Sequence, residues 1–153
     1  LAPSVDIYGS NAYRGKYGFG ASFWENVKDT WDKPVMIAEY GCPAYMEGKS
    51  GEAAEEAQAE YLKNAWQDIA YNSAGSPGAG NSIGGMLFEW VDEWWKAYEP
   101  LVHDAKRNWS GPFPDGWNYE EWLGICSQGD GKSSPFLRQL RKTYFTYKEM
   151  WNR

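Results

Sequence analysis

The 153-residue chain is poor in the residue types that bind metals or form disulfides. It contains one histidine and two cysteines, Cys42 and Cys126. Structural zinc sites use four cysteine or histidine ligands, so this composition argues against such a site, and we expect no bound metal. The two cysteines are compatible with one disulfide or with two reduced thiols, and they do not fix the redox compartment.

Positive charge and long apolar runs are also scarce. The chain has 15 Lys and Arg against 21 Asp and Glu, a formal net charge of −6. This balance argues against nucleic acid or an anionic membrane as the main partner. No run of 18 apolar residues exists, so we expect no membrane span. The chain begins with Leu1 and has no recognisable signal peptide, so we expect a single domain or a piece of a longer precursor.

Aromatic residues are abundant, with 10 Trp, 11 Tyr and 6 Phe. Their rings have flat apolar faces with a polar edge, which suits a large core and also suits a cleft that stacks against sugar rings. Core packing must account for most of them. The dense clusters of polar and aromatic residues at 90–95 and 117–122 are harder to assign to a core and favour a sugar-binding surface.

Apolar or β-branched runs bounded by turn signals predict three strands, at residues 4–13, 34–41 and 83–90. Helical patterns follow each run, directly or after a long connection. Alternation of this kind predicts an α/β fold with parallel strands and helical crossovers. All three strands have the pattern of strands buried on both faces, so we expect more sheet beside them.

The predicted helices occupy residues 23–31 after an N-cap at Ser22, 50–72 with an N-cap at Ser50, and 136–151. In the second, apolar residues recur at helical spacing at Ala57, Tyr61, Ala65 and Ile69. Its charged residues Glu55, Glu56, Glu60 and Asp68 are interpreted as a solvated face. The last carries Leu137, Leu140, Tyr144, Tyr147 and Met150. Residues 97–134 are irregular, which is typical of a lid or binding loop.

Glu39 follows four apolar or small residues at the end of the second predicted strand. An ionised carboxylate in such a place is costly unless it is paired, hydrogen-bonded or used. It either forms a salt bridge with a neighbouring loop or is functional. In a parallel barrel all carboxyl ends of strands meet at one face, where active sites lie. There the sequence places Asn11 and Tyr13 on one side of Glu39, and Glu89 and Trp90 on the other.

These motifs give the sequence a resemblance to the C-terminal part of the catalytic (β/α)8 barrel of clan A retaining glycoside hydrolases. Family 2 barrel domains and β-1,3-glucanosyltransferases are the nearest in pattern. Residues 6–13 match the sixth strand, 34–41 the seventh, and 84–90 with 92–96 the eighth. The resemblance implies that residues 1–153 form the second half of a TIM (β/α)8 barrel without its N-terminal half, and that no cofactor is needed.

The resemblance also implies roles for individual residues. Glu39 would be the catalytic nucleophile, and Tyr13 would donate a hydrogen bond that orients it. Trp90 would line the sugar at the cleavage point. Trp94 and Trp95 would line more distant subsites or else pack beneath the long loop. Asn11, Tyr40 and Glu89 complete the predicted substrate-binding residues.

One element of the family pattern is missing. The acid/base Glu of these enzymes follows an Asn at the end of the fourth strand, and no Asn-Glu pair exists in this chain. A retaining glycosidase needs two carboxyl groups roughly 5–5.5 Å apart. We therefore expect the acid/base to lie upstream of Leu1, with Glu89 as a less favoured internal candidate. His103 has no Ser or Cys partner in the sequence pattern, so we expect no hydrolytic triad.

The sequence thus predicts part of a retaining hydrolase or transglycosylase acting on a β-linked polysaccharide such as a β-glucan. The alternative is a carbohydrate-binding or scaffold module without catalysis. Expected partners are an oligosaccharide or polysaccharide, and either the N-terminal half of the barrel or a second copy that covers the open strand edges. A secreted or cell-envelope location is expected from the substrate class alone.

Overall fold

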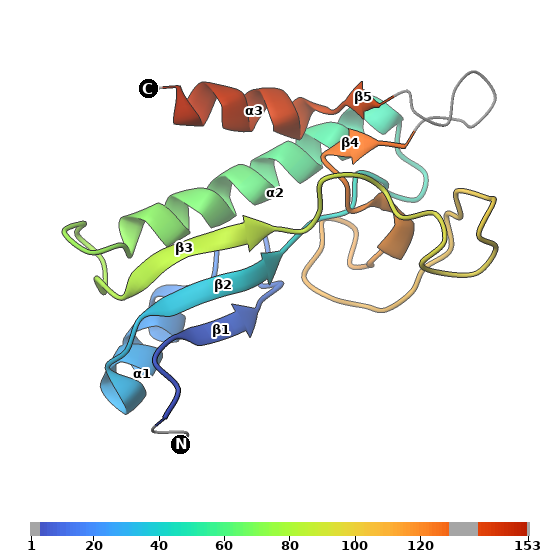
Figure 1. Ribbon diagram of the computed structural model, residues 1–153. Coiled ribbons are helices and arrows are strands. Elements are labelled where there is room, and N and C mark those ends of the chain that lie inside the picture. The colour runs from blue at the N-terminus through green and yellow to red at the C-terminus, as the bar shows by residue number, and fades with distance from the viewer. Residues whose placement is uncertain (1–3, 129–137, 153) are drawn as a thin grey trace.

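The computed structural model describes residues 4–128 and 138–152 (Figure 1). Its main sheet is parallel with strand order β1-β2-β3, formed by β1 (Tyr8–Asn11), β2 (Val35–Tyr40) and β3 (Ser82–Leu87). The crossovers contain α1 (Ala21–Trp31) and α2 (Gly51–Tyr71). The predicted α/β fold with parallel strands and helical crossovers is confirmed. The described residues form a small open sheet, with no closed barrel.

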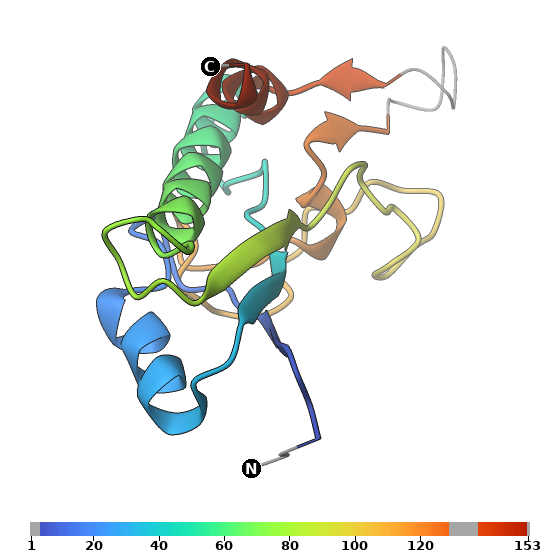
Figure 2. The ribbon, with the colours of Figure 1, turned by 60° about the vertical axis from the view of Figure 1, so that its left-hand side comes forward.

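The core lies between the sheet and its helices. Val35 and Ile37 of β2 are fully buried, and Leu62 and Ile69 of α2 are at most 2% exposed. The helices lie on one side of the sheet (Figure 2), and Ile83 on β3 is 53% exposed. The expectation that all three strands are buried on both faces is therefore wrong for the described chain, because its helices cover only one face.

The two crossover helices begin in different ways. Ser50 caps α2 as predicted, since its hydroxyl accepts a hydrogen bond from the Ala53 N–H at 3.2 Å. The predicted cap at Ser22 is wrong, because α1 begins at Ala21, two residues before the predicted start, and its N-cap is Gly20. Asp68 is also not merely a solvated charge. Its carboxylate accepts hydrogen bonds from the backbone N–H of Phe19 and the indole N–H of Trp24, at 2.6 and 3.3 Å.

The chain after β3 is held by a later segment. The N–H of Ile125 donates to the carbonyl of Glu89, and the N–H of Cys126 donates to that of Trp90, both at 2.9 Å. The segment predicted to be irregular thus forms a loop whose later part is hydrogen-bonded to the backbone that follows β3. It contains a 3-10 turn, η1 (Glu120–Trp122), and a short strand, β4 (Cys126–Ser127), that pairs antiparallel with β5 (Gln139–Leu140).

The closing helix is shorter than predicted. It is α3 (Lys142–Trp151), and Leu140 belongs to β5 instead. Phe136 and Leu137, the first apolar residues of the predicted helix, lie outside the described residues. Tyr147 of α3 is buried and donates a hydrogen bond to the Leu62 carbonyl at 2.7 Å, which fixes α3 against α2.

A buried ion pair joins α3 to the segment after β3. Asp92 is 0% exposed and Arg141 is 4% exposed. The guanidinium donates to both carboxylate oxygens at 2.7 and 2.6 Å, and the Gly124 N–H donates to the same carboxylate at 3.0 Å. Burial raises the pKa of Asp92, and Arg141 opposes that rise. Cys42 and Cys126 are both buried free thiols, which settles the alternative that the sequence left open.

We expect Arg141→Met to lower the free energy of unfolding by about 3–5 kcal/mol, because it leaves the Asp92 carboxylate buried without its partner. Urea denaturation of the wild type and the variant measures this. Lys63→Met, on the exposed face of α2, is the matched control and should change stability little. The double variant Asp92→Leu with Arg141→Met should recover part of the loss. Equal stability of Arg141→Met and the wild type would contradict this role for the pair.

Candidate active site

A bulge in β2 determines where Glu39 points. Against β3, Ile37 pairs with Gly85 and Tyr40 pairs with Leu87, so β2 has one residue more than β3 over this span. Both Ile37 and Tyr40 are buried in the core. In a regular strand Ile37 and Glu39 would share a face. The extra residue breaks that alternation and turns the Glu39 side chain away from the core. Glu39 is therefore only half-buried.

Tyr13 meets Glu39 across the carboxyl ends of two neighbouring strands. Its hydroxyl donates a hydrogen bond to Glu39 Oε2 at 3.1 Å. The Tyr13 ring contacts Trp109 edge-on, with ring centroids 6.0 Å apart, and Phe113 at 6.1 Å. Burial, followed by the negative charge of Glu39, raises the pKa of Tyr13 well above its usual range. The phenol therefore keeps its proton and is a fixed donor to the carboxylate.

Gly41 allows the chain to approach this pair closely. A Cβ at this position would clash with the Phe88 carbonyl oxygen and would lie 3.1 Å from the Tyr13 ring. The end of β3 and the Tyr13 ring therefore pack against the backbone that follows Glu39. A side chain there would push one or both away from the carboxylate.

Glu89 lies in the same neighbourhood, beside Glu93 and Lys96. Burial, with the hydrogen bond and charge of Glu93, raises the pKa of Glu89 to about 9, so its carboxyl is protonated at neutral pH. Lys96 Nζ lies 2.9 Å from Glu93 and 3.3 Å from Glu120. The charges of Glu39, Glu120 and Glu89 all act to raise the pKa of Tyr13, and of the three the effect of Glu39 is the largest.

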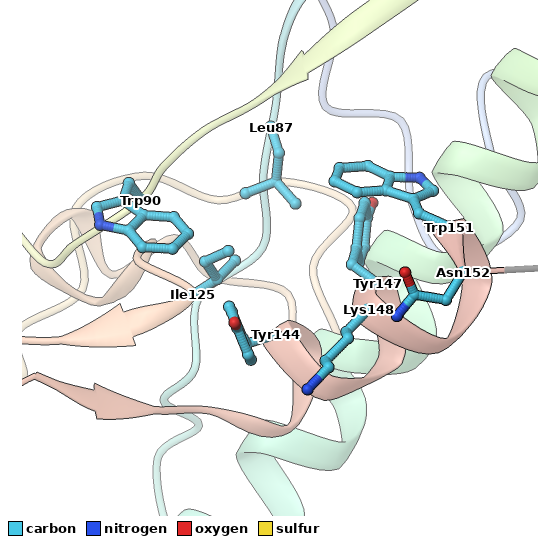
Figure 3. Close-up of a pocket in the computed structure, with 8 residues that line it drawn as sticks. All are labelled: Leu87, Trp90, Ile125, Tyr144, Tyr147, Lys148, Trp151 and Asn152. Atoms are coloured by element: carbon cyan, nitrogen blue, oxygen red, sulfur yellow. The ribbon is translucent and has the colours of Figure 1, made fainter.

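Two residues predicted to contact substrate differ in their exposure: Tyr40 is buried, whereas Trp90 is 59% exposed. Tyr40 is 1% exposed and its hydroxyl lies 3.1 Å from the Tyr147 hydroxyl in the core, because the bulge in β2 turns it inward. Trp90 packs edge-on against Tyr144 of α3 and lines an apolar pocket of about 410 Å³ (Figure 3). The prediction for Trp90 extended strand alternation past Leu87, where β3 already ends.

The remaining aromatic candidates divide between a ring stack and the surface. Trp94 stacks on His103, which stacks on Trp122, with centroids 4.8 and 3.6 Å apart. This arrangement matches the alternative of packing beneath the long loop. Trp95 is 56% exposed. His103 Nε2 donates to the Glu121 carbonyl at 2.8 Å.

The structure thus brings Tyr13 to Glu39 and groups Glu89 with Glu93 and Lys96 on the segment after β3. Lys96 and Glu120, which sequence reasoning missed, contact each other. Asn11 is exposed at the end of β1, where its backbone pairs with Glu39. Lys96 ends the 92–96 motif, which was a usable signal. Glu120 comes from the long loop, where no periodic pattern indicates which residue returns to the sheet.

The part of the chain that the structure describes contains neither a metal-type cluster of side chains nor a membrane-spanning helix. Across residues 4–128 and 138–152, no cluster of three or more His, Cys, Asp or Glu side chains has a geometry suited to a metal ion. In the same residues, no helix is both long enough and apolar enough to cross a bilayer.

The chain is similar in fold to parts of several solved structures. The chain aligns over 100% of its length with a β-D-glucuronidase from Dictyoglomus thermophilum, at 16% identity and a TM-score of 0.56. It aligns over 96% of its length with a GH2 β-galacturonidase from Eisenbergiella tayi bound to galacturonate, at 15% identity and a TM-score of 0.57. It aligns over 100% of its length with a Ruminococcus gnavus β-glucuronidase, at 16% identity and a TM-score of 0.56.

The chain has the fold of part of a glycoside hydrolase. It spans 23% of the length of each of these three structures, and identities this low establish the fold alone. Sequence comparisons add nothing to this: no family model matches the chain, and no curated protein matches it.

We expect Gly41→Ala to lower the free energy of unfolding by about 1–3 kcal/mol, because the added methyl group displaces the Phe88 carbonyl or the Tyr13 ring. Thermal and urea denaturation measure the change. Gly51→Ala is the matched control, since a Cβ there meets no atom within 4 Å and should be neutral or slightly stabilising. A Gly41→Ala chain as stable as Gly51→Ala would refute the close approach.

Stability should also depend on His103 at mildly acidic pH. Burial, with a smaller effect of the Arg141 charge, lowers the pKa of His103 to about 4 in the folded chain, below the usual 6.5. The unfolded chain then binds the proton first, so this stability is fully present above pH 6.5. It falls by about 2–3 kcal/mol as the pH drops toward 4. Urea denaturation between pH 7 and 4 should give a shallower decline for His103→Gln; parallel declines would contradict the shift.

Proposed function

We propose that this chain is part of a retaining glycoside hydrolase or transglycosylase that acts on a β-linked polysaccharide, with Glu39 as its nucleophile. The observation that carries the proposal is the Tyr13–Glu39 hydrogen bond of 3.1 Å at the carboxyl ends of two parallel strands. The likeness of the chain to part of a glycoside hydrolase fold supports it. Trp95, which is exposed, stays a proposed contact for more distant sugar units.

Each residue has a chemical role in this proposal. Glu39 attacks the anomeric carbon as the bond to the leaving oxygen breaks, which gives a covalent glycosyl ester. Tyr13 donates its hydrogen bond to the carboxylate before the attack and holds it in one orientation. Water or a sugar hydroxyl then attacks the same carbon and releases the Glu39 carboxylate. Hydrolysis and transglycosylation differ only in that acceptor.

The leaving oxygen needs a proton from a second carboxyl group. We propose that this acid lies outside the present chain, in the remaining part of a barrel of which residues 1–153 form strands six to eight. Glu89 is the internal alternative. It is protonated at neutral pH, with a pKa of about 9, as a general acid requires. With a pKa this high, however, little of the carboxylate form exists at neutral pH, and that form must accept the proton of the attacking water or hydroxyl in the second step.

Labelling of the nucleophile tests the proposal. The full-length protein that contains this chain is incubated with 2-fluoro-glycosides, and the labelled peptide is mapped by mass spectrometry. We expect the label on Glu39, and we expect Glu39→Gln to lower kcat at least 10³-fold with its fold intact. Tyr13→Phe should lower kcat less and should leave the label on Glu39.

Glu52→Gln, in the exposed first turn of α2, is the control for the same chemical change away from the site. It should keep full activity. A Glu39→Gln protein that retains turnover would exclude Glu39 as the nucleophile. Oligosaccharide binding without turnover or label would favour the carbohydrate-binding module instead. Glu89→Gln separates the two proposals for the acid, because only an internal acid predicts loss of activity toward substrates with poor leaving groups.

A further inference from the structure

The charge around the Tyr13–Glu39 pair is strongly negative. Tyr13 donates a hydrogen bond to Glu39 at 3.1 Å, and Glu120 and Glu93 both contact Lys96, which lies over the Phe88 ring. The charges of Glu39 and Glu120 both raise the pKa of Tyr13. Lys96 is the one ammonium in contact with this group among the described residues. Three carboxylates and one ammonium leave two uncompensated negative charges.

Lys96 is not available to bind an anionic ligand. Its ammonium lies 2.9 Å from Glu93 and 3.3 Å from Glu120, and it sits 4.0 Å above the centre of the Phe88 ring. Two carboxylates and an aromatic face thus share one positive charge. A third anion beside it would meet more negative than positive charge.

Other cations of the surrounding segments have partners of their own. Arg14, which follows Tyr13, lies with its guanidinium carbon 5.3 Å from the centre of the Phe23 ring on α1. Arg141 is buried in its ion pair with Asp92, and Arg107 pairs with Glu47. Lys106 lies 3.1 Å from Asp104. His103 is uncharged at neutral pH and is held between two indole rings. Within residues 4–128 and 138–152, these side chains therefore offer a substrate carboxylate no free positive partner.

We infer that the sugar unit bound at Glu39 is uncharged, and that the carboxylates around Tyr13 discriminate against hexuronic acids. This inference rests on the proposed function. It separates the chain from neighbours of the same fold that are named as glucuronidases and galacturonidases. The physical cause is repulsion in a partly buried site, where each uncompensated carboxylate about 8–10 Å from a substrate carboxylate weakens binding on the order of tenfold.

A matched pair of covalent probes tests the inference. Cyclophellitol aziridine and its 6-carboxylate have the same ring. The first carries a hydroxymethyl group where the second carries a carboxylate. The full-length protein is treated with each, in the gluco and galacto configurations, and labelling at Glu39 is timed by mass spectrometry. We expect the neutral probe to react at least 10²-fold faster than its carboxylate partner in the configuration that reacts best.

Charge variants separate repulsion from shape. Glu120→Gln removes one negative charge beside Tyr13 and should raise the relative rate of the carboxylate probe about tenfold, whereas Glu149→Gln on the exposed face of α3 should leave the ratio unchanged. The preference should also shrink in 1 M salt, where the screening length falls to about 3 Å. A ratio that responds to neither change would overturn the electrostatic cause.

The outcomes also separate this inference from the proposed function. Faster labelling of Glu39 by the carboxylate probe overturns the inference and leaves the nucleophile in place. No label on Glu39 from any of the four probes overturns both. Faster labelling by the neutral probe, with the expected response to Glu120→Gln, supports both.

Discussion

The buried pair of Asp92 and Arg141 is the interaction on which the arrangement of this chain depends. A carboxylate with no exposed surface is stable only with its partner in place, so the guanidinium must lie where α3 begins. The same carboxylate binds the Gly124 N–H, which holds the return of the long loop beside residues 89–92. One ion pair thereby positions α3, the loop and the backbone of Glu89.

The site is built on that frame by a second constraint, the bulge in β2. The strand keeps Ile37 and Tyr40 in the core and still releases Glu39 from it, which a regular alternation would not permit. Gly41 then lets the Tyr13 ring and the end of β3 approach. The carboxyl groups gathered there share one ammonium, so the packing that forms the site also sets its charge.

Much of the fold was predictable because it follows from local patterns. The apolar runs predicted the three strands, the spacing of Tyr61, Ala65 and Ile69 predicted α2, and Ser50 was recognisable as its cap. Predictions failed where a side chain's direction depends on a distant partner. Tyr40 turns inward at a bulge, and Asp68 binds the loop before α1.

The sequence by itself determined the order of strands and helices, their parallel arrangement and the short list of acidic and aromatic candidates, because periodicity and turn residues act over a few positions. Only the tertiary structure decided which candidates meet. It brought Tyr13 to Glu39, and it returned Glu120 from a loop of no regular pattern to Lys96. Such contacts join residues far apart in the chain, and their geometry depends on the whole packed core rather than on any local run of residues.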